Sequence, residues 1–272
     1  MKRHLLSYGL SVAAAVAVLL MVSLSAAAQS KPTPRTADGH PDLSGMWVER
    51  LPGDPVTPAP KADTATEKKT PPAAAASRYP SDALPYQPWA AKKARELHDA
   101  ATTDPLLHCL PYGEPRIWGG PHPARIIQMP KEIVILYERD TTFRVIPTDG
   151  TQHPKDLDPS YMGDSVGRWE GDTLVVDVTG LNDKSWLGSG RNAGEGAGTF
   201  HSDALHVTER ISRSDFDHIM VQITDDDPKV FAKPWAYGWN MRLVPNEHFY
   251  EDVTCSNEKD LAHEVPEKSA SK

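Results

Sequence analysis

Between residues 131 and 245, short runs of alternating apolar and polar residues are separated by turn-forming residues. A period of two is typical of half-buried β-strands, and the sequence Glu-Gly-Asp at 170–172 is typical of a hairpin turn. The pattern predicts seven strands in this region, at residues 132–138, 142–147, 165–169, 173–180, 203–212, 217–224 and 237–245. A further strand is predicted at residues 45–48, an apolar island among prolines.

These eight strands indicate a mainly-β fold. Eight sequential antiparallel strands can close into an up-and-down barrel wide enough for one small ligand, and closure removes exposed sheet edges. We therefore expect an eight-stranded antiparallel, lipocalin-like barrel, with a sandwich of the same strands as the rival arrangement. Strands do not alternate with helices, so a parallel α/β sheet is not expected.

The chain before the barrel differs in composition. Residues 29–85 are rich in Pro and Ala and contain the first strand, and residues 60–80 offer almost nothing to bury, which indicates an extended linker. One amphipathic N-terminal helix is predicted over residues 88–102. We place this helix and the barrel in one domain, residues 86–255, followed by a polar tail at 256–272.

The N-terminus has the three parts of a secretory signal peptide. Lys2 and Arg3 precede an apolar run over residues 12–24, and three alanines at 26–28 form a cleavage site. The alternative is a membrane anchor, for which the run is short. We predict a signal peptide at residues 1–28, a periplasmic or secreted mature protein, and no membrane association after cleavage.

Net charge indicates which partners are excluded, and the cysteines indicate a disulfide. Asp and Glu number 37 against 29 Lys and Arg, giving a net charge of −8, which argues against nucleic-acid and anionic-membrane partners. Cys109 and Cys255 are the two cysteines of the sequence, and in an oxidising compartment we expect them to form a disulfide. The absence of a Cys-x-x-Cys-His motif excludes covalently attached c-type haem.

Longer motifs resemble a known family. They comprise a Gly-x-Trp at 45–47, typical of lipocalin-like barrels, within PRTADGHPDLSGMW (34–47), then CLPYGEPR (109–116), FRVIPTDGTQHP (143–154), MGDSVGRWEGDTLVVDVTGLND (162–183) and HSDALHVTER (201–210). Together they resemble a large family of secreted bacterial proteins, over most of the mature chain. The resemblance implies a lipocalin or calycin-like barrel and implies no particular activity.

The densest polar cluster is the motif at 201–210. Alternate residues of a strand share a face, so Glu209 lies with Leu205 and Val207, whereas His206 and Arg210 lie on the other face. If the apolar row faces the barrel interior, Glu209 either pairs with Arg144 or Arg210, or has a raised pKa suited to acid–base chemistry.

Histidine and aspartate add further candidates. His201 or His206 could move protons, and Asp177 interrupts an apolar strand, so it should meet an Arg, a His or a ligand. A metal held by His201 and His206 is disfavoured, because a five-residue spacing places them on opposite faces of a strand. We therefore predict no metal site.

Two hypotheses of function follow. The first is an enzyme without an organic cofactor, of lyase, isomerase or hydratase type, acting on a small cyclic or aromatic molecule. Its catalytic candidates are His206, Glu209, His201 and Asp177, and its substrate-binding candidates are Arg144, Tyr137, Trp186, Asn182 and Arg210. The second is a non-catalytic barrel that binds a small apolar ligand. A structural envelope module is a third reading.

Overall fold

The computed structural model describes residues 31–49, 80–100, 104–119, 122–187 and 198–252. The chain divides into two compact units, Met1–Pro32 and Thr33–Lys272, and the fold below is that of the second. The predicted signal peptide and the polar tail lie outside the described residues, as does most of the segment that precedes the helix.

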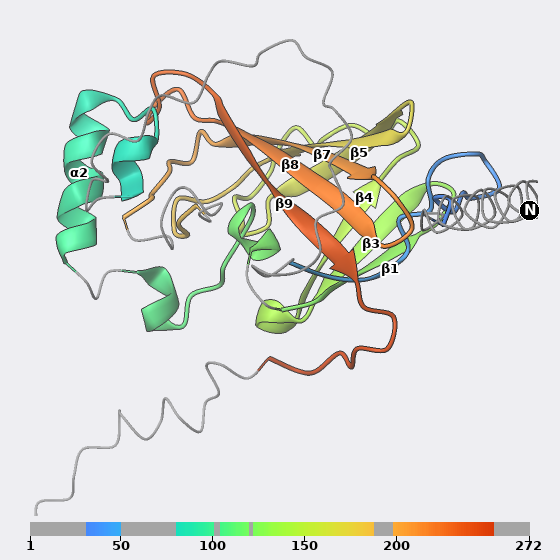
Figure 1. Ribbon diagram of the computed structural model, residues 1–272. Helices are drawn as coiled ribbons and strands as arrows, with labels where there is room; N and C mark the ends of the chain where they lie inside the picture. The colour runs from blue at the N-terminus through green and yellow to red at the C-terminus, as the bar shows by residue number, and fades with distance from the viewer. Residues whose placement is uncertain (1–30, 50–79, 101–103, 120–121, 188–197, 253–272) are drawn as a thin grey trace, which may run out of the picture. The chain divides into compact units, whose positions relative to one another are not determined.

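Nine antiparallel strands form one nearly closed barrel (Figure 1). The strands are β1 (Gly45–Glu49), β2 (Ala124–Gln128), β3 (Glu132–Tyr137), β4 (Thr142–Pro147), β5 (Asp164–Glu170), β6 (Thr173–Thr179), β7 (His206–Arg213), β8 (His218–Asp226) and β9 (Trp235–Leu243). Their order is β4-β3-β2-β1-β9-β8-β7-β6-β5, so every neighbour is a chain neighbour except the pair β1 and β9. The mainly-β barrel prediction is confirmed at this level.

The two ends of the strand order, β4 and β5, approach each other without forming a hydrogen-bonded ladder among the described residues. Side chains fill this seam tightly. A Cβ atom added at Gly167 of β5 would lie 2.9 Å from the Ile146 side chain of β4 and 3.1 Å from that of Thr148. Glycine at 167 therefore lets β5 come close to β4.

The predicted count of eight strands is wrong, because β2 adds a ninth. It has only five residues and lies between Pro123 and Pro130, so its alternation is too short to stand out. Its inward residues are Ala124 and Ile126, and it pairs with β1 and β3.

The predicted strand at 203–212 also begins later than expected. β7 starts at His206, because the Asp227 carboxylate accepts hydrogen bonds from the backbone N–H (2.6 Å) and hydroxyl (2.9 Å) of Ser202 and holds the preceding residues in a turn.

One end of the barrel is closed by Trp47 of β1. Its ring is fully buried, and its Nε1–H donates to the carbonyl of Leu43 at 2.9 Å. The guanidinium of Arg213, at the end of β7, lies 5.0 Å from the Trp47 ring centroid. Above this plug the core consists of inward aliphatic residues of successive strands, such as Ile135, Val176 and Val221.

The predicted helix is present as α2 (Pro88–Asp99), with Pro88 in its first turn and Ala90 and Ala94 buried. The buried residues of the helix are small alanines, and another segment of the chain packs directly against them. Gly198, with φ of +80°, lies so near that an added Cβ would be 2.2 Å from the Ala94 carbonyl oxygen. Residues 80–83, 105–108, 116–118 and 139–141 form short 3₁₀ turns, named η2 to η5 in this order.

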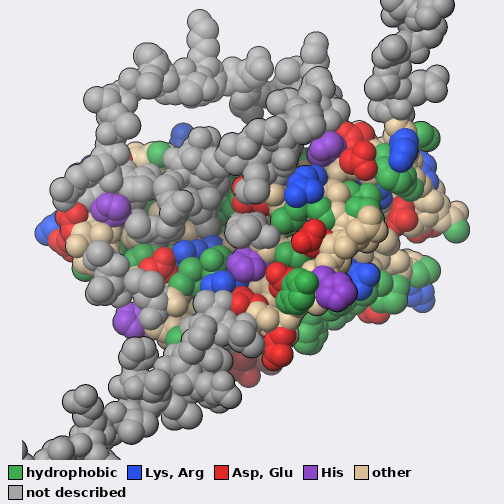
Figure 2. All heavy atoms as spheres, turned by 60° about the horizontal axis from the view of Figure 1, so that its bottom comes forward, with side chains coloured by type: hydrophobic (Ala, Val, Ile, Leu, Met, Phe, Trp, Pro, Cys, Tyr) green, Lys and Arg blue, Asp and Glu red, His purple; other side chains and the backbone are tan. Residues whose placement is uncertain are grey.

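Acidic and basic side chains are interspersed on the face shown in Figure 2, with histidines and apolar residues among them. Among the described residues, no helix is both long and apolar enough to cross a membrane.

Candidate functional site

A buried cluster of charged side chains crosses the barrel interior. Arg144 extends from β4 and meets Glu209 of β7 in a paired arrangement, with Nη2 to Oε2 at 2.5 Å and Nη1 to Oε1 at 3.1 Å. Glu114 approaches the same guanidinium, with its Oε2 2.8 Å from Nη1. Arg144 is 4% exposed and both glutamates are 0% exposed. Two carboxyl groups therefore share one cation away from solvent.

Strand alternation explains two of these positions. On β7, Val207, Glu209 and Ile211 are buried, so the apolar row and its carboxylate face inward. On β4, Arg144 and Ile146 are buried in the same way. Of the two predicted alternatives for a pair with Glu209, the structure therefore has Arg144.

Glu114 comes from an irregular segment and not from a strand. The preceding Gly113 has φ of +69°, and a Cβ there would lie 2.8 Å from the Tyr161 carbonyl oxygen, so only glycine fits without displacement. The Glu114 N–H donates to that same carbonyl at 2.8 Å. The following turn η4 carries Trp118, whose Nε1–H donates to Glu209 Oε1 at 2.6 Å. The turn thus delivers both a second carboxyl group and a donor to Glu209.

Electrostatics separate the two glutamates. Burial raises the pKa of Glu114 well above its usual value and outweighs the opposing effect of Arg144. Burial acts in the same direction on Glu209, but the charge of Arg144 and the hydrogen bonds to Glu209 outweigh it, so the pKa of Glu209 is lowered. The pKa values of the two carboxyl groups are thus displaced in opposite directions, which favours a proton on Glu114 and a negative charge on Glu209, beside a guanidinium that stays charged. Such a split is typical of acid–base pairs in enzymes.

Tyr137 of β3 lies next to this cluster. Its ring packs edge-on against Trp118, with centroids 5.5 Å apart. Its hydroxyl group is buried and has no hydrogen-bond partner among the described residues. Burial raises the pKa of Tyr137, so the hydroxyl remains a neutral donor. The role of Tyr137 as a substrate ligand stays a prediction.

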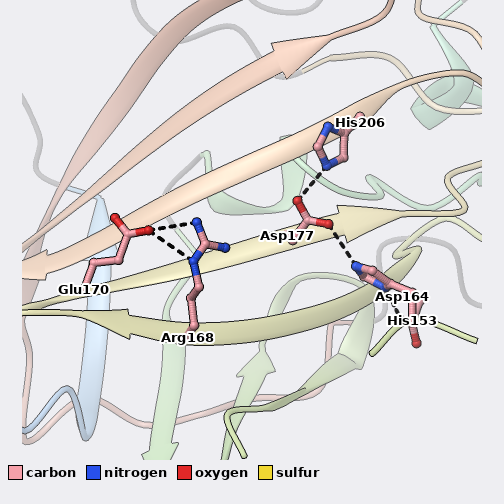
Figure 3. Close-up of polar contacts among 6 residues, drawn as sticks. All are labelled: His153, Asp164, Arg168, Glu170, Asp177 and His206. Atoms are coloured by element: carbon pink, nitrogen blue, oxygen red, sulfur yellow. Dashed lines mark hydrogen bonds and ion pairs between the residues drawn. The ribbon is translucent and has the colours of Figure 1, made fainter. Parts of the chain in front are cut away.

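Two of the predicted catalytic residues lie elsewhere, on the outer face of the barrel (Figure 3). Asp177 of β6 accepts from His206 Nε2 at 2.6 Å through one oxygen and contacts His153 Nε2 at 2.9 Å through the other. The second ring nitrogen of His153 lies 2.5 Å from Asp164. The expectation that Asp177 meets a His is therefore confirmed, and its partners are half-exposed.

The residues predicted to act together thus occupy separate places. His206 and Glu209 lie on opposite faces of β7, so they cannot serve one substrate together. Arg210, a predicted substrate ligand, also points outward and pairs with Glu170 at 2.9 Å. The structure therefore does not bring the candidates together in one place: the interior holds Glu209, Arg144 and Tyr137, and the outer face holds His206, Asp177 and Arg210.

His201 lies in a third location, before β7. It is buried, and its Nε2 lies 3.1 Å from the Ser185 hydroxyl while Nδ1 lies 3.0 Å from the Ser202 carbonyl oxygen. Burial lowers its pKa, so the ring is neutral. Trp186 and Asn182, which precede His201 in the sequence, are also buried. The Asn182 side chain accepts a hydrogen bond from the Lys184 N–H at 3.0 Å and so shapes the local turn.

Within the described residues, no group of three or more His, Cys, Asp or Glu side chains is arranged to hold a metal ion. Cys109 ends the η3 turn in a left-handed conformation, with φ of 58°. Cys255 lies outside the described residues, so the disulfide stays a prediction.

The sequence reasoning missed two interior carboxyl groups, Glu114 and Asp225. Glu114 lies outside any periodic segment, although the adjacent Gly113 and Pro115 signal a fixed backbone. Asp225 belongs to an Asp-Asp-Asp run at 225–227 that resembles an exposed turn. The alternation of buried residues along β8, at Ile219, Val221 and Ile223, continues to Asp225 and would have predicted that its side chain faces inward.

A pH-dependent prediction follows from the outer cluster. Partial burial acts to raise the pKa of Asp177, but hydrogen bonds from His206 and His153 outweigh it and lower the pKa. A lowered pKa in the folded state stabilises the fold above the unfolded value of about 3.9, and this stabilisation is lost as pH falls through the folded pKa.

We therefore expect Asp177→Asn to lower the free energy of unfolding by no more than about 1 kcal/mol near pH 7, since the site is half-exposed. The difference from the wild type should shrink as the pH falls below about 4. Urea unfolding over this range measures it. A difference that is constant with pH would contradict the role assigned to the Asp177 carboxylate.

Searches of the chain against family models, curated proteins and solved structures find no match.

Proposed function

We propose that the protein is an enzyme that performs acid–base chemistry on a small cyclic or aromatic molecule inside the barrel. The observation that carries this proposal is the pair Glu114 and Glu209, two buried carboxyl groups on the Arg144 guanidinium whose pKa values are displaced in opposite directions. A carboxyl group that carries a proton thus lies beside one that is ionised, the two forms that a general acid and a general base require.

In this mechanism the Glu209 carboxylate removes a proton from a carbon of the substrate. Glu114, which is protonated, gives its proton to the departing or developing oxygen, so that one proton enters and one leaves the substrate. Arg144 and the Tyr137 hydroxyl stabilise the negative charge that develops in between. The outcome is an elimination, an isomerisation or, in reverse, a hydration.

We also propose that the protein is secreted or periplasmic and that its barrel is lipocalin-like. A signal peptide at residues 1–28 would direct the mature chain to the periplasm or outside the cell. The Gly-x-Trp at 45–47, with Trp47 buried at one end of the barrel, favours a lipocalin-like barrel. Its partner is then a small molecule and not a nucleic acid or a membrane.

The second candidate is a barrel that binds its ligand without turnover. It is favoured by the aromatic rings of β9, where Trp235 stacks on Tyr237 at 4.6 Å and Tyr237 contacts Trp239 at 5.1 Å. Such a row offers aromatic faces and edges to a ring-shaped ligand. Binding alone does not require two carboxyl groups in different protonation states, and so we rank it second.

Glu114→Gln tests the enzyme. Glutamine has the shape and charge of a protonated glutamate, so the fold should keep its melting temperature while the acid is removed. With a panel of small cyclic and aromatic carbonyl compounds and their hydroxy derivatives, we expect the wild type to eliminate, isomerise or hydrate at least one member. The variant should be slower by about 10²–10⁴-fold.

The matched control is Glu170→Gln, which removes an exposed carboxylate from the outer face and should retain full activity. Product formation followed by NMR in deuterated water measures both turnover and proton abstraction at carbon. Wild-type rates in Glu114→Gln would refute its role as the acid. Tight retention of a panel member without any turnover would favour the binding protein.

A further inference from the structure

The interior holds a carboxyl group that the mechanism above does not use. Asp225 lies on β8 and is 0% exposed. Among the described residues its one side-chain hydrogen-bond partner is the Tyr237 hydroxyl, and no Lys, Arg or His of these residues forms an ion pair with it. A buried carboxyl group in this condition is costly to the fold, which points to a role in binding.

Asp225 faces the same interior as the Arg144 cluster. It continues the buried alternation of Ile219, Val221 and Ile223 along β8, and its charge interacts with that of Glu209. Glu114 is affected by it in the same way. Three acidic groups, Glu114, Glu209 and Asp225, thus act on one another in the described interior, and the Arg144 guanidinium is already engaged by the two glutamates.

Aromatic rings surround the approach to Asp225. Trp235 pairs directly with it across the β8–β9 ladder, and Tyr237 follows on the same face of β9. Phe231 contacts Trp235 at 5.8 Å and Tyr86 at 4.7 Å. Trp235 and Tyr237 are only half-buried, so this group of rings reaches from the carboxyl group to solvent.

We infer that Asp225 and the rings of Trp235, Tyr237, Phe231 and Tyr86 bind the cationic group of a small organic ligand, an amine or a quaternary ammonium. This inference rests on the proposed function, because it names the class of substrate that the interior site takes. A carboxylate beside several aromatic faces is the arrangement that recognises organic cations. A cation placed here also balances the excess of acidic groups in the interior.

The Asp225 carboxyl group should carry a proton in the empty site and lose it when a cation binds. Burial raises the pKa of Asp225 well above its usual value against the opposing hydrogen bond of Tyr237, and the acidic neighbours Asp227 and Glu209 raise it further, so the protonated form is favoured when nothing is bound. A bound cation makes the carboxylate the favoured form. Binding therefore releases a proton, and the affinity for the cation rises with pH.

The test uses two probes of similar size, benzyltrimethylammonium and neutral benzyl alcohol, with the mature full-length protein. Calorimetric titration in two buffers with different heats of ionisation measures both the affinity and the number of protons released. We expect the wild type to bind the ammonium at least about tenfold more tightly than the alcohol, with release of a proton.

Asp225→Asn should lose this preference and the proton release, while its melting temperature stays near that of the wild type because the replaced group is neutral in the empty site. The matched control is Asp226→Asn, the next residue of β8, which changes the net charge equally but lies on the other face and should bind as the wild type does. Trp235→Leu should also weaken the binding of benzyltrimethylammonium.

Equal binding of the two probes, no binding of the ammonium, or an unchanged affinity in Asp225→Asn would each overturn the cation site. These results are distinct from failure of the proposed function. Loss of activity in Glu114→Gln on neutral substrates would support the acid–base pair even where the ammonium does not bind. Ammonium binding in a protein that turns over nothing would leave the cation site in a binding barrel.

Discussion

Replacing Arg144 by methionine should lower the free energy of unfolding by about 3–5 kcal/mol. The guanidinium is the one cation that contacts Glu209 and Glu114 in the described interior. Methionine fills a similar volume but leaves the ionised Glu209 buried with hydrogen bonds from Trp118 and Glu114 and no opposite charge. Removal of one partner of a buried ion pair is expensive because the other charge is left uncompensated.

Urea unfolding followed by tryptophan fluorescence measures this effect. The control is Arg168→Met, which breaks an ion pair of similar length, 2.8 Å to Glu170, on the exposed outer face and should cost less than about 1 kcal/mol. The double variant Arg144→Met with Glu209→Gln should recover part of the loss, because the buried charge is then gone. Equal losses in Arg144→Met and Arg168→Met would contradict the buried cluster.

The second large effect is expected from Trp47→Ala, at about 3–5 kcal/mol of unfolding free energy. The side chain is 0% exposed and fills one end of the barrel, so its removal leaves a cavity beneath the core. It also removes the hydrogen bond to Leu43 and the ring under the Arg213 guanidinium.

Trp89→Ala is the matched control for this variant. Trp89 lies on α2 with 52% of its surface exposed, so its truncation should change stability by no more than about 0.5 kcal/mol. Both variants are compared by thermal and urea unfolding. A Trp47→Ala protein as stable as Trp89→Ala would show that the barrel end is not closed by this ring.

The alternation of apolar and polar residues along the strands was enough to predict part of the fold and part of the site. The alternation at 206–213 separates Glu209 from His206, and the structure has them on opposite faces of β7. The same alternation defines β3, β4, β6 and β8 to within a few residues. Residue type alone did not show which of the candidates lie together, because they divide between the two faces of the sheet.

The remainder depends on contacts that no local pattern encodes. Glu114 reaches the interior through a turn fixed by the Tyr161 carbonyl, which is distant in sequence. The partner of Glu209 lies on β4, two strands beyond its own neighbour β6 across the seam, so the choice between Arg144 and Arg210 needed the closed barrel. Five residues between two prolines were too few to predict β2.

The pairing of β1 with β9 has a consequence for how the chain folds. Trp47 of β1 lies opposite Leu243 of β9, so the first and last strands of the barrel must find each other across most of the chain. Contacts this distant in sequence slow folding, with times of about milliseconds to seconds for β-rich domains. The barrel also cannot be completed on the ribosome until β9 has emerged. The order of synthesis therefore leaves β1 without its β9 partner until the final strand is made.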